Sequence, residues 1–115
     1  MYVDGFVLPV PKKNVKAYRR MAQLGGKIFR KHGALEFREC IGDDLDAKVG
    51  RSFKRLANAK PSETVFFSYI VYRSRAHRDR VNARMMKDPA MAAIADMPFN
   101  PKRMAYGGFR VLVEA

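Results

Sequence analysis

The sequence predicts an α+β protein with an antiparallel sheet, in the element order β-α-β-β-α-β with an extra short helix. Four stretches rich in β-branched and aromatic residues are separated by two long amphipathic stretches, an order typical of the ferredoxin-like fold. The chain has 115 residues, which suits one domain, 1–115, with one modest core. Hydrophobic residues make up 48% of it, which argues against disorder.

Residues 2–10 predict the first strand, because apolar side chains occupy both of its faces and Pro9 and Pro11 end it. Asp4 is the one charged residue in this strand. We expect Asp4 to be solvated near the strand end; if it is buried instead, it requires a partner.

Residues 12–32 predict the first helix, with Asn14 as an internal cap and Gly33 as the C-terminal cap. Gly25 and Gly26 each cost about 1 kcal/mol inside a helix. We interpret them as positions where the helix approaches the sheet closely, because the sequence contains neither of the glycine spacings of phosphate-binding loops.

Residues 34–41, ALEFRECI, predict a second strand that is polar enough on one side to lie at a sheet edge. Whether Arg38 faces inward or into solvent depends on the register and is left open. Cys40, the single cysteine, is expected to be a small buried thiol, and its lack of an internal partner favours a reducing cytoplasm. The irregular stretch 42–62 is expected either to hold a short strand near 49–53 or to act as an arm over a neighbouring subunit.

Residues 65–72, VFFSYIVY, have the strongest strand signature, and both faces of this third strand are apolar. One layer of helices covers only one face of a sheet, so we expect a second copy of the chain to cover the other face. Ser74 predicts the N-terminal cap of the second long helix, 75–87.

The remainder of the chain predicts a short third helix over 89–95, with Asp88 as its cap and Pro89 in its first position. Residues 103–114 predict the fourth strand, interrupted by a bulge at the glycine pair 107–108.

Four segments resemble the DUF1428 (YbaA-like) family of bacterial proteins: MYVDGFVLPVPKKN, HGALEFRECIGDD, FSYIVYRSRAHRDRVNARMMKDP and MPFNPKRMAYGGFRVLVEA. The resemblance runs nearly end to end. It implies the dimeric α/β-barrel superfamily, in which two ferredoxin-like sheets face each other in a homodimer. Antibiotic-biosynthesis monooxygenases, EthD-like proteins and muconolactone isomerases are similar to this superfamily. The resemblance implies no particular activity.

We expect a small, mostly apolar pocket between the sheet and the helices, in a small-molecule binder or a cofactor-independent enzyme of the monooxygenase or isomerase kind. Whether the protein is an enzyme is left open. The candidate catalytic residues are Tyr69 as a hydrogen-bond donor and His77 or Asp4 as a base. Arg38 and Tyr72 are the candidate ligand-binding residues, with Arg38 holding an anionic group.

The net charge of +12 is compatible with an anionic partner. An RNA-recognition domain shares the predicted strand order, but 65–72 lacks the basic-Gly-aromatic start that such a domain requires. Specific nucleic-acid recognition is therefore not expected, and any such binding should be weak and salt-sensitive. A structural or regulatory dimer without chemistry is the third alternative.

Other partners are not expected. Two separated histidines and scattered carboxylates give no metal-ligand spacing, and no cofactor is predicted. No apolar run approaches the ~20 residues of a membrane span. The N-terminal segment lacks a basic region before its apolar residues, which favours a strand over a signal peptide.

Overall fold

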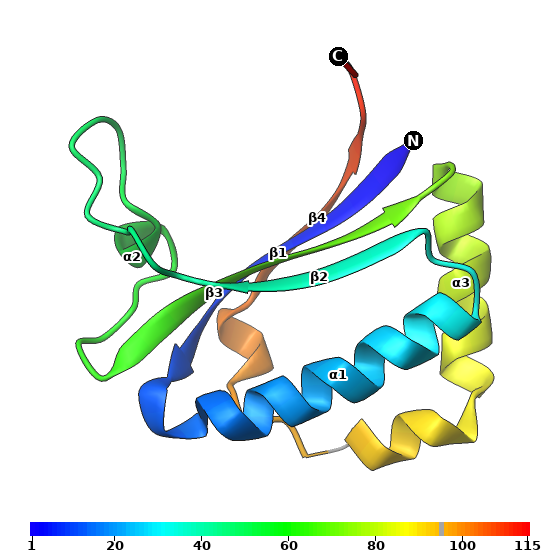
Figure 1. Cartoon of the computed structure of the whole chain (residues 1–115), viewed down its shortest axis with the longest axis horizontal. Coiled ribbons are helices and arrows are strands. Elements are labelled where there is room, and N and C mark those ends of the chain that lie inside the picture. The colour runs from blue at the N-terminus through cyan, green and yellow to red at the C-terminus, as the bar shows by residue number, and fades with distance from the viewer. Residues whose placement is uncertain (95) are drawn as a thin grey trace.

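A computed structural model describes residues 1–94 and 96–115, which form one antiparallel sheet with two long helices on one side (Figure 1). The elements follow the chain as β1 (Tyr2–Pro11), η1 (Lys12–Asn14), α1 (Val15–Lys31), β2 (Glu36–Ile41), α2 (Phe53–Leu56), β3 (Glu63–Tyr72), α3 (Arg75–Lys87), η2 (Pro89–Ile94), η3 (Pro101–Arg103) and β4 (Ala105–Arg110).

The strand order in the sheet is β2-β3-β1-β4, with every neighbouring pair antiparallel. The two central strands, β1 and β3, are the ones with apolar residues on both faces, and the more polar β2 lies at an edge, as expected. A central strand is hydrogen-bonded to a neighbouring strand along both of its edges, whereas an edge strand leaves one edge in contact with water.

The two faces of the sheet differ in what covers them. Even-numbered residues of β1 and β3 point to α1 and α3 and form the core, as in Leu8, Phe66 and Ile70. The opposite side, here called the open face, has the short α2 near one end, where the Phe53 and Phe67 rings are 6.2 Å apart. The open face is formed by Val3, Gly5, Val7, Arg38, Cys40, Phe67, Tyr69, Gly107 and Phe109.

The helix caps expected from the sequence are present. Gly33 follows α1 with φ of 114°, a conformation that favours glycine. The Ser74 side chain accepts a hydrogen bond from the His77 backbone N–H at 3.1 Å. Asp88 Oδ1 accepts from the Ala90 N–H at 2.9 Å, which caps η2. The last predicted residue of that short helix, Ala95, lies outside the described residues.

Asn14 stands at the N-terminal cap position of α1, but the predicted capping hydrogen bond is absent. Its side chain makes no cap contact and instead donates from Nδ2 to the Pro98 carbonyl at 3.0 Å, which ties the start of α1 to the distant 97–100 loop. The strand predicted near 49–53 is also wrong, because this stretch leads into α2 with Ser52 as its cap.

The bulge predicted at Gly107 and Gly108 is wrong, because β4 pairs with β1 residue by residue. The glycines make room for aromatic rings instead. A β-carbon on Gly108 would lie 2.8 Å from Tyr2 Cε2, which is closer than real contacts allow. The strand also ends at Arg110, four residues earlier than predicted, and the tail beyond it leaves Leu112 exposed.

The buried thiol predicted for Cys40 is wrong for a single chain. Cys40 lies on the open face of edge strand β2 and is exposed. Alternation along the strand places it opposite to Phe37 and Glu39, whose side chains point to α1.

Gly26 is where α1 approaches the sheet most tightly, as its sequence position predicts. A β-carbon there would lie 2.8 Å from Cδ1 of Phe37, whose ring stacks on Phe29. The close approach to the sheet predicted at Gly25 is wrong, because a β-carbon there would meet only Ile94 Cδ1 of η2, at an ordinary distance of 3.8 Å.

We therefore expect Gly26→Ala to destabilise the protein and Gly25→Ala to stabilise it. Both substitutions gain about 1 kcal/mol of helix propensity, but overpacking against Phe37 costs about 1–3 kcal/mol. Urea denaturation of the two variants measures the difference, expected at about 2 kcal/mol. Equal stability of the two variants would contradict the close approach.

Candidate functional site

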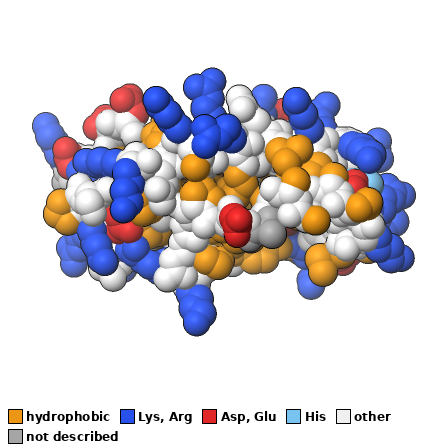
Figure 2. Space-filling view, turned by 90° about the horizontal axis from the view of Figure 1, so that it is seen from below, with side chains coloured by type: hydrophobic (Ala, Val, Ile, Leu, Met, Phe, Trp, Pro, Cys, Tyr) orange, Lys and Arg blue, Asp and Glu red, His pale blue; other side chains and the backbone are white. Residues whose placement is uncertain are grey.

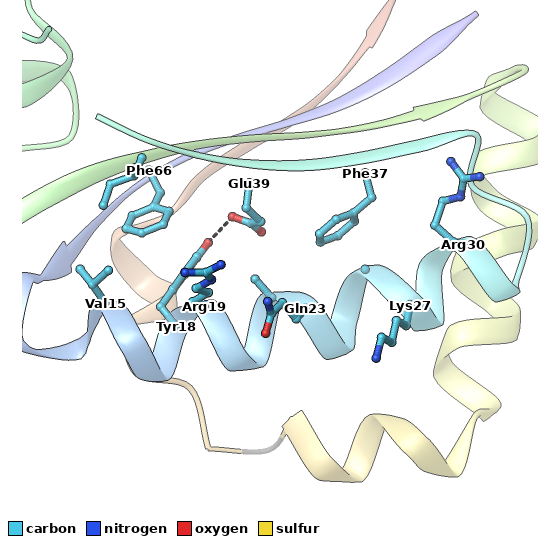
Figure 3. Close-up of a pocket in the computed structure, with 12 residues that line it drawn as sticks. Val15, Tyr18, Arg19, Gln23, Lys27, Arg30, Phe37, Glu39 and Phe66 are labelled. Atoms are coloured by element: carbon cyan, nitrogen blue, oxygen red, sulfur yellow. Dashed lines mark hydrogen bonds between the residues drawn. The ribbon is translucent and has the colours of Figure 1, made fainter. Parts of the chain in front are cut away.

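Two neighbouring cavities lie on the helix side of the sheet. The outer groove, of about 810 Å³, runs between α1 and β2 and is bordered by Arg19, Lys27 and Arg30 from α1 and Phe37, Glu39 and Ile41 from β2 (Figure 3). The inner cavity, of about 220 Å³, lies deeper and is lined largely by apolar side chains, four of them methionines: Met21, Met91, Met97 and Met104. Four residues line both spaces and separate them: Tyr18, Ala22, Phe37 and Glu39.

Glu39 is the polar centre between the two cavities. It shares one face of β2 with Phe37 and Ile41, and its carboxylate points to α1 (Figure 3). The Tyr18 hydroxyl donates to Glu39 Oε2 at 2.7 Å, and the Ser68 hydroxyl donates to the same oxygen. Helix α1, edge strand β2 and central strand β3 thus each supply one member of this cluster.

Burial gives this cluster its acid–base character. Removal from water raises the pKa of Glu39, against the two hydrogen bonds from Ser68 and Tyr18, which lower it. Burial, followed by the charge of Glu39, raises the pKa of Tyr18 far above its usual value. Tyr18 therefore stays a hydroxyl donor, while Glu39 can exchange a proton within an apolar site.

Glu39→Gln is expected to become more stable relative to the wild type as the pH rises. Because the pKa of Glu39 is raised in the folded state, its stabilising contribution is complete below its unfolded pKa and is lost as the pH rises through its folded pKa. Glutamine keeps an oxygen acceptor for both hydroxyls but does not ionise. Urea denaturation of both proteins from pH 4 to pH 8 isolates this effect, because the other carboxyls titrate alike. A stability difference independent of pH would show that the Glu39 carboxyl titrates normally.

The structure buries Asp4, so the expectation that it is solvated is wrong and the alternative, a buried charge with a partner, holds. Asp4 Oδ1 lies 2.6 Å from Arg78 Nη1, and the Tyr106 hydroxyl donates to Oδ2 at 3.3 Å. Burial raises the pKa of Asp4 and outweighs the opposing effect of Arg78. This ion pair connects α3 to β1, outside both cavities.

Tyr72 and His77 also lie on the helix side but line neither cavity. Their rings meet edge to face at 5.9 Å in the core. His77 Nδ1 accepts from the Arg73 backbone N–H at 3.0 Å, and burial lowers the pKa of His77. The ring is therefore neutral with its lone pair occupied, which disfavours a role as base. The Tyr72 hydroxyl is fully buried and has no hydrogen-bond partner among the described residues.

Arg38 and Tyr69 lie together on the open face. The Arg38 guanidinium is 5.8 Å from the centre of the Tyr69 ring and pairs with Glu36 at 3.4 Å. The register thus gives the outward alternative for Arg38. The expected pocket between sheet and helix exists, but the five candidate residues do not converge on it.

The residues at the pocket, Tyr18, Glu39 and Ser68, were not candidates from the sequence. One signal was available: Glu39 alternates with Phe37 and Ile41, so it is a charge on the apolar side of its strand.

Among residues 1–94 and 96–115, no three His, Cys, Asp or Glu side chains gather as a metal site would require. No helix in the same ranges is long and apolar enough to cross a membrane.

Comparison with known proteins gives one matching family. The sequence model described as "Protein of unknown function (DUF1428)" matches residues 1–101. "Uncharacterized protein YbaA" of Escherichia coli (strain K12) is 44% identical over 115 residues, covering 98% of this chain and 97% of that protein, and YbaA of Shigella flexneri gives the same values.

A similar fold occurs in the crystal structure of an uncharacterized NIPSNAP domain protein from Burkholderia xenovorans. The TM-score is 0.57 at 16% sequence identity, with 100% of this chain and 95% of that chain covered. At this identity the likeness concerns the fold alone.

Proposed function

The chain belongs to the DUF1428 family of proteins of unknown function. We propose a function for it on the basis of the two cavities beside its sheet. The protein binds a small, largely apolar molecule there and acts on it as a cofactor-independent enzyme that moves a proton. The observation that carries the proposal is the half-buried Glu39 carboxyl, which lies between the two cavities and is held by Tyr18 and Ser68.

The arrangement suits proton transfer next to a carbonyl group. Both hydroxyls hydrogen-bond to Oε2 of Glu39 and fix the carboxyl plane, and no described side chain donates to Oε1. Oε1 is therefore the oxygen that accepts a proton from a substrate carbon and returns it to a neighbouring atom, as in an isomerisation. Apolar walls strengthen this step, because a raised pKa makes the carboxylate a stronger base than one in water.

The experiment is a nuclear magnetic resonance assay of hydrogen–deuterium exchange in D₂O, run on a panel of aryl and alkyl ketones with exchangeable α-hydrogens. The wild type is expected to accelerate exchange for at least one compound, and Glu39→Gln to reduce the rate by about 10²–10⁴-fold, the usual contribution of a general base. Glu36→Gln is the matched control, since Glu36 is exposed on the same strand with its side chain on the other face. Full activity of Glu39→Gln would overturn the catalytic assignment.

We also propose that two copies associate through their open faces as ferredoxin-like domains. Aromatic side chains support this: Phe67 on central strand β3 is 43% exposed, and Phe109 on edge strand β4 is 62% exposed. Apolar sheet faces of this kind are usually covered. The stretch 42–62 lies on the same side of the sheet (Figure 1), which supports its role as an arm over the second copy.

Two further points concern the compartment of the protein and nucleic-acid binding. The exposed free thiol of Cys40 supports a reducing compartment such as the cytoplasm. Specific nucleic-acid binding is not proposed. An RNA-recognition domain stacks bases on aromatic residues of its first and third strands, and Phe6 of β1 instead points to the helix side and stacks on Tyr106 at 5.0 Å.

A further inference from the structure

We infer that the ligand of the outer groove is an amphipathic anion: an apolar ring or alkyl body that carries a single carboxylate or similar group. This inference rests on the proposed function, because it concerns the same groove, and it names the class of molecule that the groove takes.

A row of cationic side chains forms the helix border of the groove. Arg19, Lys27 and Arg30 line it together with Gln23, at spacings of four, four and three residues, which place them along one side of α1 (Figure 3). Helix α1 contains no acidic residue. Among the described ion pairs none involves Arg19 or Lys27, so both cations are available to an anionic ligand.

Apart from Glu39, the strand side of the groove is apolar. Phe37, Ile41 and Phe66 line it, and Val15 lies at the end near the start of α1. The volume of about 810 Å³ lies within the range of small-molecule sites. Seen from below, on the helix side of the sheet, Lys and Arg side chains surround apolar patches (Figure 2). A ligand with a charged end on the helix border and an apolar body on β2 meets both surfaces.

The contrast between the two borders also restricts the charge of the ligand. Glu39 is a carboxylate lining the groove, and burial already disfavours its ionised form. A cationic ligand would face the like charges of Arg19 and Lys27. Both side chains are exposed to solvent, so a neutral ligand would cost them nothing but would gain no charge-assisted contact. A monoanion with its charge on the helix border avoids the repulsion and gains that contact.

The probes for the test are naphthalene-2-carboxylate and 2-naphthylmethanol, which share a ring and differ in charge. Binding is measured by isothermal titration calorimetry at 50 mM and at 300 mM NaCl. We expect the carboxylate to bind at least about tenfold more tightly than the alcohol at 50 mM NaCl, as a charge-assisted hydrogen bond allows. The double variant Arg19→Gln/Lys27→Gln should lose this preference.

The matched control is Lys16→Gln/Arg20→Gln, which removes the same charge from the same helix at exposed positions that do not line the groove. It should keep the preference. Ala22→Trp, which fills the position shared by both cavities, should abolish binding of both probes.

Each result decides between the two proposals. If both probes bind with equal affinity and Ala22→Trp blocks them, the proposed pocket stands and the anionic ligand class is overturned. If both double variants lose the preference equally, the effect comes from net charge alone and the inference also fails. If neither probe binds at millimolar concentration, the small-molecule site itself is contradicted.

Discussion

Arg78→Ala is expected to destabilise the folded protein by about 3–5 kcal/mol, the usual effect of leaving a buried charge without its partner. The Asp4 side chain is 3% exposed and that of Arg78 is 11% exposed, with 2.6 Å between the bonded atoms. The same guanidinium nitrogen lies 3.1 Å from the Tyr106 hydroxyl, and the guanidinium lies 5.0 Å from the centre of the Tyr2 ring. Removal of the Arg78 side chain therefore eliminates the contacts that join α3 to β1 and β4.

Urea denaturation measures the effect of this substitution. Arg80→Ala is the matched control, because Arg80 lies on the same helix, is exposed, and should change stability by no more than about 0.5 kcal/mol. Combining Arg78→Ala with Asp4→Asn should recover part of the loss, since the buried carboxylate is then neutral. A loss below about 1 kcal/mol for Arg78→Ala would show that water reaches Asp4 in solution.

Phe67→Asp combined with Tyr69→Lys is expected to convert a homodimer into monomers or to make the protein insoluble. Both side chains lie on the open face of central strand β3, and charges there would be buried between two sheets. Light scattering is the measurement, and the wild type should give twice the 13.1 kDa mass of one chain. A wild-type monomer at micromolar concentration would remove the proposed face-to-face association.

Met86→Asp serves as the control for this pair. Met86 is 85% exposed on α3, so the variant also adds a charge at an exposed apolar residue, but on the helix side. It should remain dimeric. The reactivity of Cys40 provides an independent test of the association, because its thiol lies on the open face. Its reaction with a thiol reagent should be slow in the dimer and faster in the monomeric variant.

Much of the fold followed from residue patterns in the sequence. The doubly apolar segment 65–72 predicted a central strand, and the mixed segment 34–41 predicted an edge strand; both strands lie where expected. The residues Ser74 and Gly33 marked helix ends correctly because caps depend on local backbone geometry. The glycine pair at 107–108 misled the prediction, since its cause, the neighbouring Tyr2 ring, comes from a strand at the other end of the chain.

The sequence by itself thus determined the four strands, the two long helices and their order, and it predicted a pocket between the sheet and the helices. Only the tertiary structure decided which side chains meet there. Side chains along a strand alternate with a period of two, so the register of β2 on β3 turns Arg38 outward and Glu39 inward. The partners of Glu39, Tyr18 and Ser68, are 21 and 29 residues away in the sequence. The Tyr18 contact is set by how α1 packs on the sheet, and the Ser68 contact by the register of β2 on β3, neither of which a local pattern encodes.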